Sequence, residues 1–162
     1  MKMIFDLDMD RCCACGACAV ACMDQNDIEI TEEPPLRKVF AMEGTNGHAY
    51  ISVACMHCED APCIAACPVG CLSKDERGLT VYDSTSCIGC HSCAMACPFG
   101  APTYNRFGKM QKCDGCAERL SHGLEPACVR TCSLGALKVY TEEEYAKVHT
   151  ERSLRKIAEK LV

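Results

Sequence analysis

Sixteen of the eighteen cysteines fall into four groups of four, and this spacing constrains the fold more than any other feature of the chain. The groups are Cys12, Cys15, Cys18 and Cys22; Cys55, Cys58, Cys63 and Cys67; Cys87, Cys90, Cys93 and Cys97; and Cys113, Cys116, Cys128 and Cys132. Leu, Ile, Val and Phe together supply only 30 of the 162 residues, and Trp is absent. Because so thin an apolar core rarely stabilises a small protein alone, disulfides or metal must contribute.

Metal is favoured over disulfides by what surrounds the cysteines. The first residues, Met1–Asp8, lack the charged segment, apolar run and cleavage site of a secretory signal, and no twin-arginine pair precedes Cys12. No apolar stretch is long enough for a membrane span. We therefore expect a reducing cytoplasm, where closely spaced cysteines are typical of metal ligands. The net charge of −5 and the lack of a basic stripe disfavour nucleic-acid binding.

The third group, followed by Pro98, matches the bacterial ferredoxin pattern C-x2-C-x2-C-x3-C-P without a departure. Three thiolates on a tight loop reach three irons of one [4Fe-4S] cluster, and the helix that follows carries the fourth cysteine to the partner cluster. The second group, followed by Pro68, and two less regular copies repeat the pattern. Four [4Fe-4S] clusters are thus predicted.

Zinc is the alternative metal, and it fits best at the fourth group with its long insert, 117–127. A colourless protein would indicate a zinc-bound structural module, and a brown one that bleaches with dithionite would indicate clusters. Radical chemistry on S-adenosylmethionine is disfavoured because no C-x3-C-x2-C run occurs. No other catalytic motif is visible, so we expect a protein that is not an enzyme by itself.

An internal repeat, C-x-x-G-[AC], begins at the fourth cysteine of the last three groups. Its glycines, Gly70, Gly100 and Gly135, suit a helix stop or a turn with positive φ. Cys71 occupies the slot of Ala101 and Ala136, so it is predicted to be a small buried residue rather than a ligand. Cys13 aligns with Ile88 and is likewise predicted to be a packing residue.

Short elements are expected between the groups. Ile28–Thr31 is predicted to be a strand, 37–43 and 49–54 a β-hairpin, and Asp75–Gly78 a turn. Strands are also expected at 79–82 and 137–140.

The tail from Thr141 differs from the rest, since it has many charges and no cysteine. Thr141 and Glu144 have the spacing of a capping box. One or two short helices, interrupted near His149, are expected. Their apolar stripe packs either on the protein's own surface or on a partner; it consists of Leu154, Ile157, Ala158 and Leu161.

Two kinds of side chain are candidates for acting on the clusters. His57 and His91 lie inside cysteine loops, where they either donate to sulfur and raise a cluster potential or point outward. Cations that compensate the buried negative charge are expected next to ligand cysteines, and the candidates are Arg11, Lys112 and Arg130.

With four groups in this order and a wide insert only in the fourth, residues 1–140 resemble the four-cluster iron–sulfur subunits of molybdenum and tungsten pterin oxidoreductases. Dimethyl-sulfoxide reductase, formate dehydrogenase and aldehyde oxidoreductase complexes have such subunits. The runs Cys55–Cys63 and Lys112–Cys116 look typical of the family. The chain departs from it in having Met23 and Ser133 after the fourth cysteine.

The resemblance implies an α+β fold of two nested 2[4Fe-4S] ferredoxin modules. It implies an outer module of residues 1–35 and 103–140, a β-hairpin insertion at 36–54, an inner module at 55–102 and a helical tail at 141–162. The implied ligand sets are Cys55, Cys58, Cys63 and Cys97; Cys87, Cys90, Cys93 and Cys67; Cys12, Cys15, Cys18 and Cys132; and Cys113, Cys116, Cys128 and Cys22.

The function implied by the resemblance is electron transfer to or from a catalytic subunit that carries a molybdenum or tungsten pterin. Further redox subunits, or copies of this chain, are additional expected partners. A free-standing polyferredoxin carrier and an electron-transfer subunit of a hydrogenase or formate-type complex remain alternatives.

Overall fold

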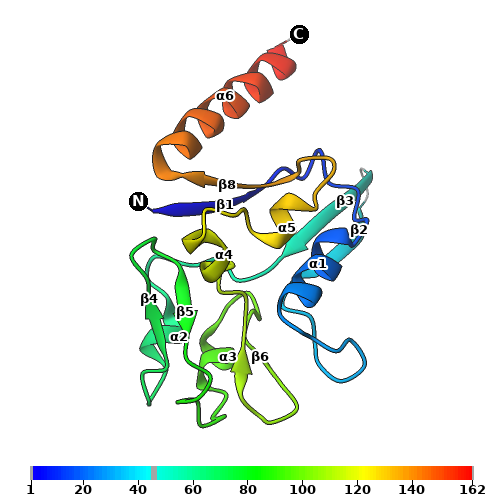
Figure 1. Cartoon of the computed structure of the whole chain (residues 1–162). Helices are drawn as coiled ribbons and strands as arrows, with labels where there is room; N and C mark the ends of the chain where they lie inside the picture. Colours follow the sequence, from blue (N-terminus) through cyan, green and yellow to red (C-terminus); the bar gives the residue numbers. More distant parts are fainter. Residues whose placement is uncertain (1, 45–46, 162) are drawn as a thin grey trace.

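The computed structural model describes residues 2–44 and 47–161, which form a mixture of short helices and small sheets (Figure 1). Every sheet in the described residues has two antiparallel strands. The strands are β1 (Met3–Leu7), β2 (Lys38–Gly44), β3 (Gly47–Val53), β4 (Leu72–Lys74), β5 (Thr80–Tyr82), β6 (Thr103–Tyr104), β7 (Met110–Gln111) and β8 (Leu137–Thr141). The helices are α1 (Ala17–Gln25), α2 (Pro62–Ala65), α3 (Ser92–Ala96), α4 (Ala117–Ser121), α5 (Ala127–Arg130) and α6 (Glu142–Leu161). The predicted α+β class is confirmed.

A helix follows the loop of every cysteine group, as the ferredoxin pattern predicts. Each of these helices, α1, α2, α3 and α5, contains the third cysteine of its group. In α1 the fourth cysteine, Cys22, is also helical, whereas in the other groups the fourth cysteine lies just beyond the helix end. The helix therefore begins around the third cysteine and separates the fourth from the loop that holds the first two.

Strands β1 and β8 bring the two ends of the cysteine-rich region together, with Phe5 opposite Val139. Helix α1 packs on α5, and both lie below the β1–β8 pair in the view of Figure 1. Helices α2 and α3 pack on each other and lie with the β4–β5 pair in the part of Figure 1 below β1. The first and fourth groups thus lie together, and so do the second and third.

The β6–β7 hairpin lies with the second and third groups. Tyr104 and Met110, from its two strands, pack with Cys63, Cys87 and Cys93. Among the described residues the apolar interior is divided into three small clusters of buried residues, and each of them contains ligand-type cysteines. The core is therefore built around sulfur, as the thin apolar composition predicts.

The predicted hairpin is confirmed by β2 and β3, which pair from Lys38 opposite Val53 to Gly44 opposite Gly47. The predicted strand at Ile28–Thr31 is wrong, because the amides of Glu32 and Glu33 both donate to the carbonyl of Glu29 and turn the chain. Ile28 is buried instead beside Cys22 and Met23. Its apolar side chain therefore packs in the core of a loop rather than in a sheet.

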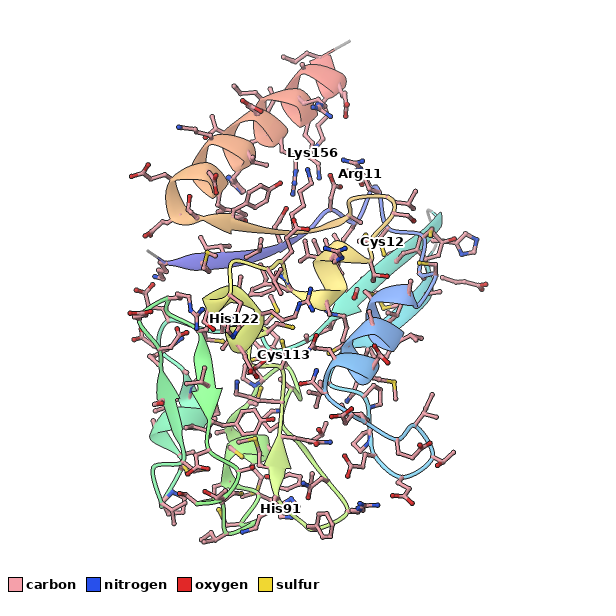
Figure 2. The ribbon with its side chains drawn as sticks, viewed as in Figure 1. Arg11, Cys12, His91, Cys113, His122 and Lys156 are labelled. Atoms are coloured by element: carbon pink, nitrogen blue, oxygen red, sulfur yellow. The ribbon has the colours of Figure 1, made fainter. Side chains whose placement is uncertain are left out.

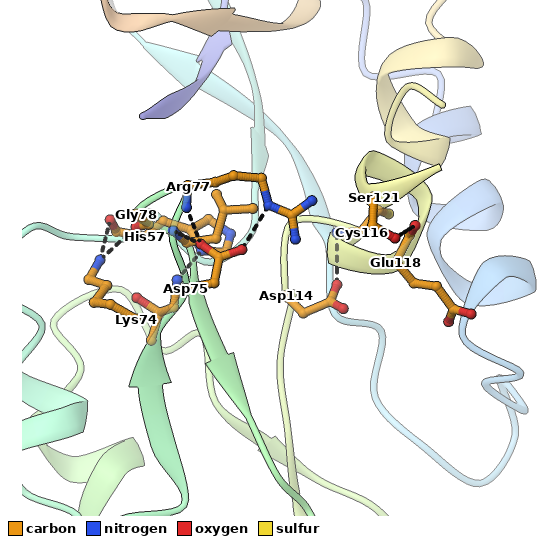
Figure 3. Close-up of polar contacts among 11 residues, drawn as sticks. His57, Lys74, Asp75, Arg77, Gly78, Asp114, Cys116, Glu118 and Ser121 are labelled. Carbon is orange, nitrogen blue, oxygen red and sulfur yellow. Dashed lines mark hydrogen bonds and ion pairs between the residues drawn. The ribbon is translucent and has the colours of Figure 1, made fainter. Parts of the chain in front are cut away.

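The predicted turn at Asp75–Gly78 is confirmed, and the Asp75 carboxylate holds it by accepting the amides of Arg77 and Leu79 (Figure 3). The three repeat glycines all have positive φ, which are 64°, 60° and 57° for Gly70, Gly100 and Gly135. The residue after each glycine is buried; these residues are Cys71, Ala101 and Ala136. The burial predicted for Cys71 is confirmed, and its exclusion from the cluster ligands stays a prediction.

The packing role predicted for Cys13 is wrong, because Cys13 is exposed. Ile88, at the same place in the third loop, is exposed as well. The same position is therefore exposed in both loops.

The tail is a single helix, α6, so the interruption predicted near His149 is wrong. The helix runs on through Thr150, whose hydroxyl donates to the carbonyl of Ala146. The capping box is confirmed, since the amide of Glu144 donates to Thr141 Oγ1 and the Glu144 carboxylate accepts the Thr141 amide.

The apolar stripe of α6 does not pack on the described part of the chain. Leu154, Ile157 and Leu161 are 61%, 56% and 81% exposed. The helix is held from another side, where Arg152 forms a paired contact with the Asp6 carboxylate at 2.9 and 3.3 Å. None of the described helices is both long and apolar enough to cross a membrane.

Candidate iron–sulfur cluster sites

The four cysteine loops share one backbone feature at the residue before their second cysteine. This residue has a positive φ in every loop, and the values are 56° for Ala14, 47° for His57, 69° for Gly89 and 76° for Gly115. In the last two loops the turn directs the glycine amide to the sulfur of the first cysteine, at 3.4 Å from Cys87 and 3.4 Å from Cys113. Such concave runs of amides favour anions, so the loops suit thiolates.

The first group and the end of the fourth share one cavity. It is lined by Cys12, Cys15, Cys18 and Cys132, together with apolar residues such as Val39 and Leu137. The fourth cysteine of the first group, Cys22, does not line this cavity. It is buried at the far end of α1 instead.

Cys22 lies close to the thiols of the fourth group. The pKa of Cys22 is raised to about 12, chiefly by burial and in part by the charges of Cys128 and Cys116. Burial also raises the pKa of Cys113 to about 12, with Cys22 and Cys128 adding to the effect. These four sulfurs therefore share one buried region, and α1 carries Cys22 into it.

The fourth cysteines of the second and third groups each lie near the loop of the other group. Burial raises the pKa of Cys63, and the nearby thiols of Cys55 and Cys97 act in the same direction. A hydrogen bond with Ser92 lowers the pKa of Cys90, while the neighbouring Cys67 opposes that shift. Cys97 thus lies near the second loop and Cys67 near the third.

The arrangement differs from that of single-metal sites. In residues 2–44 and 47–161, no three His, Cys, Asp or Glu side chains converge closely enough to hold one metal ion. A tetrahedral zinc site needs its sulfurs about 2.3 Å from a common centre. A cubane instead takes one thiolate on each of its irons, so it needs four sulfurs spread around a larger centre.

A buried cation contacts the backbone of the fourth cysteine loop. Lys112, which sequence reasoning selected, is almost fully buried, and its ammonium group donates to the carbonyls of Cys113 and Thr80. Arg11 and Arg130 are exposed, although Arg11 also lines the cavity of Cys12 and Cys132. Figure 2 shows Arg11 at the surface near α6 and Cys113 in the middle of the molecule.

Three further cations contact the loops and were missed from the sequence. Lys74 donates to the carbonyls of His57 and Cys58 in the second loop (Figure 3), and Lys109 donates to the carbonyl of Cys87 in the third. Arg37 is buried between the first and fourth groups. No local pattern could identify these residues, because each reaches its loop from a separate hairpin or connection.

His57 faces sulfur, as one of the two predictions for it stated. Its Nδ1 accepts the amide of Thr80 at 3.0 Å, so the proton of the neutral ring resides on Nε2, which lies 3.8 Å from Cys113 Sγ. Burial lowers the pKa of His57 to about 3, which keeps the ring neutral near pH 7. A residue of the second loop thereby contacts a cysteine of the fourth.

His91 does not face sulfur in this way. It is exposed, and its ring packs at a tilt against Tyr104 with centroids 3.8 Å apart. The outward-pointing prediction therefore holds for His91. Figure 2 shows His91 and Cys12 toward opposite ends of the molecule, with Cys113 between them.

Loops of this kind define an iron–sulfur protein that transfers electrons one at a time. Comparison with known families makes the class specific, because the 4Fe-4S dicluster domain matches residues 47–142. The chain belongs to this family.

Relatives extend the match to most of the chain. It is 42% identical over 158 residues to the B subunit of anaerobic dimethyl sulfoxide reductase from Escherichia coli K12, covering 90% of this chain and 76% of that protein. The chain is 39% identical over 137 residues to the thiosulfate reductase electron transfer subunit PhsB of Salmonella typhi, and the match covers 81% of this chain and 71% of that protein. The chain is 36% identical over 174 residues to the hydrogenase-2 operon protein HybA of Escherichia coli O157:H7, and the match covers 89% of this chain and 52% of that protein.

These matches confirm the predicted class. The chain is an electron-transfer subunit of an oxidoreductase complex rather than the catalytic component, and its cofactors are [4Fe-4S] clusters. The sixteen grouped cysteines are the ligand number that four such clusters need.

Proposed function

We propose that the four clusters are bound by crossed ligand sets, in which each fourth cysteine serves the partner cluster. The sets are Cys12, Cys15, Cys18 and Cys132; Cys113, Cys116, Cys128 and Cys22; Cys55, Cys58, Cys63 and Cys97; and Cys87, Cys90, Cys93 and Cys67. The observation that carries this proposal is the position of Cys22, which lies among the thiols of the fourth group and outside the cavity of the first.

Two nested ferredoxin modules follow from these sets. The pairing of β1 with β8 and the packing of α1 on α5 support an outer module built from both ends of the cysteine-rich region. The packing of Tyr104 and Met110 on the inner cysteines supports an inner module that extends through β7, beyond residue 102.

The partner in this proposal is a catalytic oxidoreductase subunit that carries a molybdenum or tungsten pterin. The names of the reductase relatives support it. The exposed stripe of α6 supports a subunit that docks rather than a freely diffusing polyferredoxin, since apolar side chains at that exposure favour burial against another protein. Similarity to HybA favours a second candidate, a hydrogenase-type complex.

Anaerobic purification of the tagged chain from its native cell tests the partner. A copurifying large subunit with a pterin and molybdenum or tungsten supports the first candidate, and one with nickel supports the second. A chain that elutes alone, fully loaded with iron, would support the free carrier.

Cytoplasmic placement is part of the proposal. It is supported by the sixteen grouped cysteines, since a reducing compartment keeps thiols available for cluster assembly. Fractionation of the native cell, followed by detection of the chain in the cytoplasmic and periplasmic fractions, tests it.

A further inference from the structure

Arg37 is a buried cation without a carboxylate partner in the described part of the chain. It is 4% exposed and lies just before β2. Its Nη1 donates to Ser52 Oγ at 3.0 Å and to the Ser52 carbonyl at 3.3 Å. No ion pair among residues 2–44 and 47–161 includes Arg37. Since a buried guanidinium needs an anion nearby, its surroundings must supply one in another form.

The anions available to Arg37 are thiolates from two cluster sites. Burial alone lowers the pKa of Arg37, but the thiols around it outweigh burial and raise the pKa above its ordinary value. Three of these thiols, those of Cys128, Cys113 and Cys22, belong to one proposed ligand set. The fourth, Cys18, belongs to the neighbouring set, and it packs with Cys128 in one buried cluster. Arg37 therefore lies where the two outer sites meet.

One hydrogen-bonding group of Arg37 is left for a partner outside the polypeptide. Nε is buried and has no acceptor within the described residues. Buried N–H groups are seldom left unpaired in native proteins. A cluster sulfur, either a cysteine thiolate or a bridging sulfide, is an acceptor of suitable charge at this place.

Ser52 extends the contact to the first loop. Its Oγ accepts from Arg37 and lies 3.3 Å from Cys18 Sγ. An iron-bound thiolate has no proton to give, so the hydroxyl proton is the one shared with sulfur. The positive charge of Arg37 polarises this hydroxyl and strengthens its donation to Cys18.

We infer that Arg37 raises the reduction potentials of both outer clusters and so acts as a positioning residue for electron transfer. Its charge acts on both clusters, and its contact with Ser52 acts in addition on the Cys18 cluster. The inference rests on the proposed ligand sets. A reduced cluster carries one more negative charge than an oxidised one, so a fixed cation in a low-dielectric interior stabilises the reduced form. Placed where the two sites meet, Arg37 favours an electron on either cluster.

The test is an EPR-monitored redox titration of the anaerobically purified full chain. Signals are assigned beforehand by replacing one cysteine of each ligand set with serine. In Arg37→Gln, we expect both outer clusters to become at least tenfold harder to reduce, a shift of about 59 mV to lower potential for a one-electron centre. The inner clusters should keep their potentials. Ser52→Ala should lower the potential of the Cys18 cluster alone.

Two further variants separate charge from packing. Arg37→Lys keeps the charge and should shift the outer potentials less than Arg37→Gln does. Arg106→Gln removes an exposed arginine that pairs with Glu32, and it should shift none of the four.

Unchanged outer potentials in Arg37→Gln, or equal shifts of all four clusters, would overturn the inference. If Arg37→Gln loses iron, a Ser52→Ala protein whose Cys18 cluster keeps its potential would overturn it equally. Failure of the ligand sets themselves would appear separately, as a wild-type chain with fewer than four clusters or with differently assigned signals.

Discussion

At the residue scale, His57 holds a backbone conformation that the third and fourth loops assign to glycine. A left-handed residue with a Cβ costs about 1–2 kcal/mol, yet His57 adopts φ of 47° where Gly89 and Gly115 stand in their loops. Its ring compensates by stacking on Phe5, accepting the Thr80 amide and facing Cys113. The side chain therefore ties a loop of the inner pair of groups to a cysteine of the outer pair.

Replacing His57 with glycine isolates the contribution of this ring, since glycine suits the backbone. The buried Thr80 amide loses its acceptor, which costs about 1–3 kcal/mol, and the Cys113 sulfur loses a donor. We expect the visible absorption of the clusters to bleach at a lower temperature and the cluster on Cys113 to become harder to reduce. His122→Gly, at an exposed histidine, is the control. Unaltered bleaching and potential would show that the ring only fills space.

Cys71 and Cys97 allow ligand and non-ligand cysteines to be distinguished. Cys71→Ala should retain all four clusters, because Ala101 and Ala136 occupy the same buried slot in the other repeats. Its Sγ lies 3.5 Å from Cys67 Sγ, so the variant also tests whether this contact matters to the cluster on Cys67. Cys97→Ala should damage the cluster of the second group. An intact EPR signal from that cluster in Cys97→Ala would contradict the crossed ligand sets.

At the element scale, the third loop packs tightly on the β6–β7 hairpin through Gly89. A Cβ at Gly89 would lie 2.6 Å from the carbonyl oxygen of Gly108, whereas a Cβ at Gly108 would meet nothing within 4 Å. Both glycines have positive φ, 69° and 71°, so both alanine variants share the same backbone strain.

We expect Gly89→Ala to lose the cluster of the third loop and Gly108→Ala to keep it. The difference reflects the backbone clash, since the strain of about 1–2 kcal/mol is common to both. Iron analysis and the EPR signal of that cluster measure the outcome. Equal iron content in the two variants would mean that the hairpin moves aside at little cost.

Helix α6 carries the second element-scale prediction. Changing Leu154, Ile157 and Leu161 together to serine removes the exposed stripe but keeps the Arg152–Asp6 contact. If a partner buries these side chains, each contributes roughly 1.5–3 kcal/mol before ordering costs. We therefore expect full iron content but a weakened complex with the copurifying subunit, as measured by size-exclusion chromatography of the coexpressed proteins.

Deleting residues 150–162 is the companion experiment, since it also removes Arg152. A complex that survives the serine changes but not the deletion would assign the docking role to the charged face of α6. Loss of clusters on deletion would show that the helix supports the ferredoxin core.

At the scale of the whole molecule, the clusters are expected to be part of the core. Because its buried residues form three small groups centred on cysteine, removing metal leaves little apolar contact, and binding free energy becomes folding free energy. The anaerobic protein should contain about sixteen irons and sixteen acid-labile sulfides per chain, with no zinc. After chelation, we expect loss of hydrogen-exchange protection in β1 and β8. A chain with about half this iron plus zinc, or a protected apoprotein, would contradict the prediction.

Much of this molecule could be predicted from its sequence because its determinants are local. The cysteine spacing, the repeat glycines and the capping box at Thr141 each specify a turn or a helix end within a few residues. The position of Arg37 could not be predicted, since Ser52 and Cys18 meet it only after distant segments pack. The strand predicted at Ile28 was wrong because an apolar residue between acidic ones fits a strand edge as well as a loop core.

The pairing of β1 with β8 also has a consequence for the order of biosynthesis. Residues 3–7 find their partner only when residues 137–141 have left the ribosome, whereas the second and third groups are complete by residue 97. Inner loops are therefore available to the cellular iron–sulfur loading machinery well before outer ones can close. A nascent chain stalled between these points would leave the cysteines of the first group exposed, because Cys132, their proposed partner, has not yet emerged.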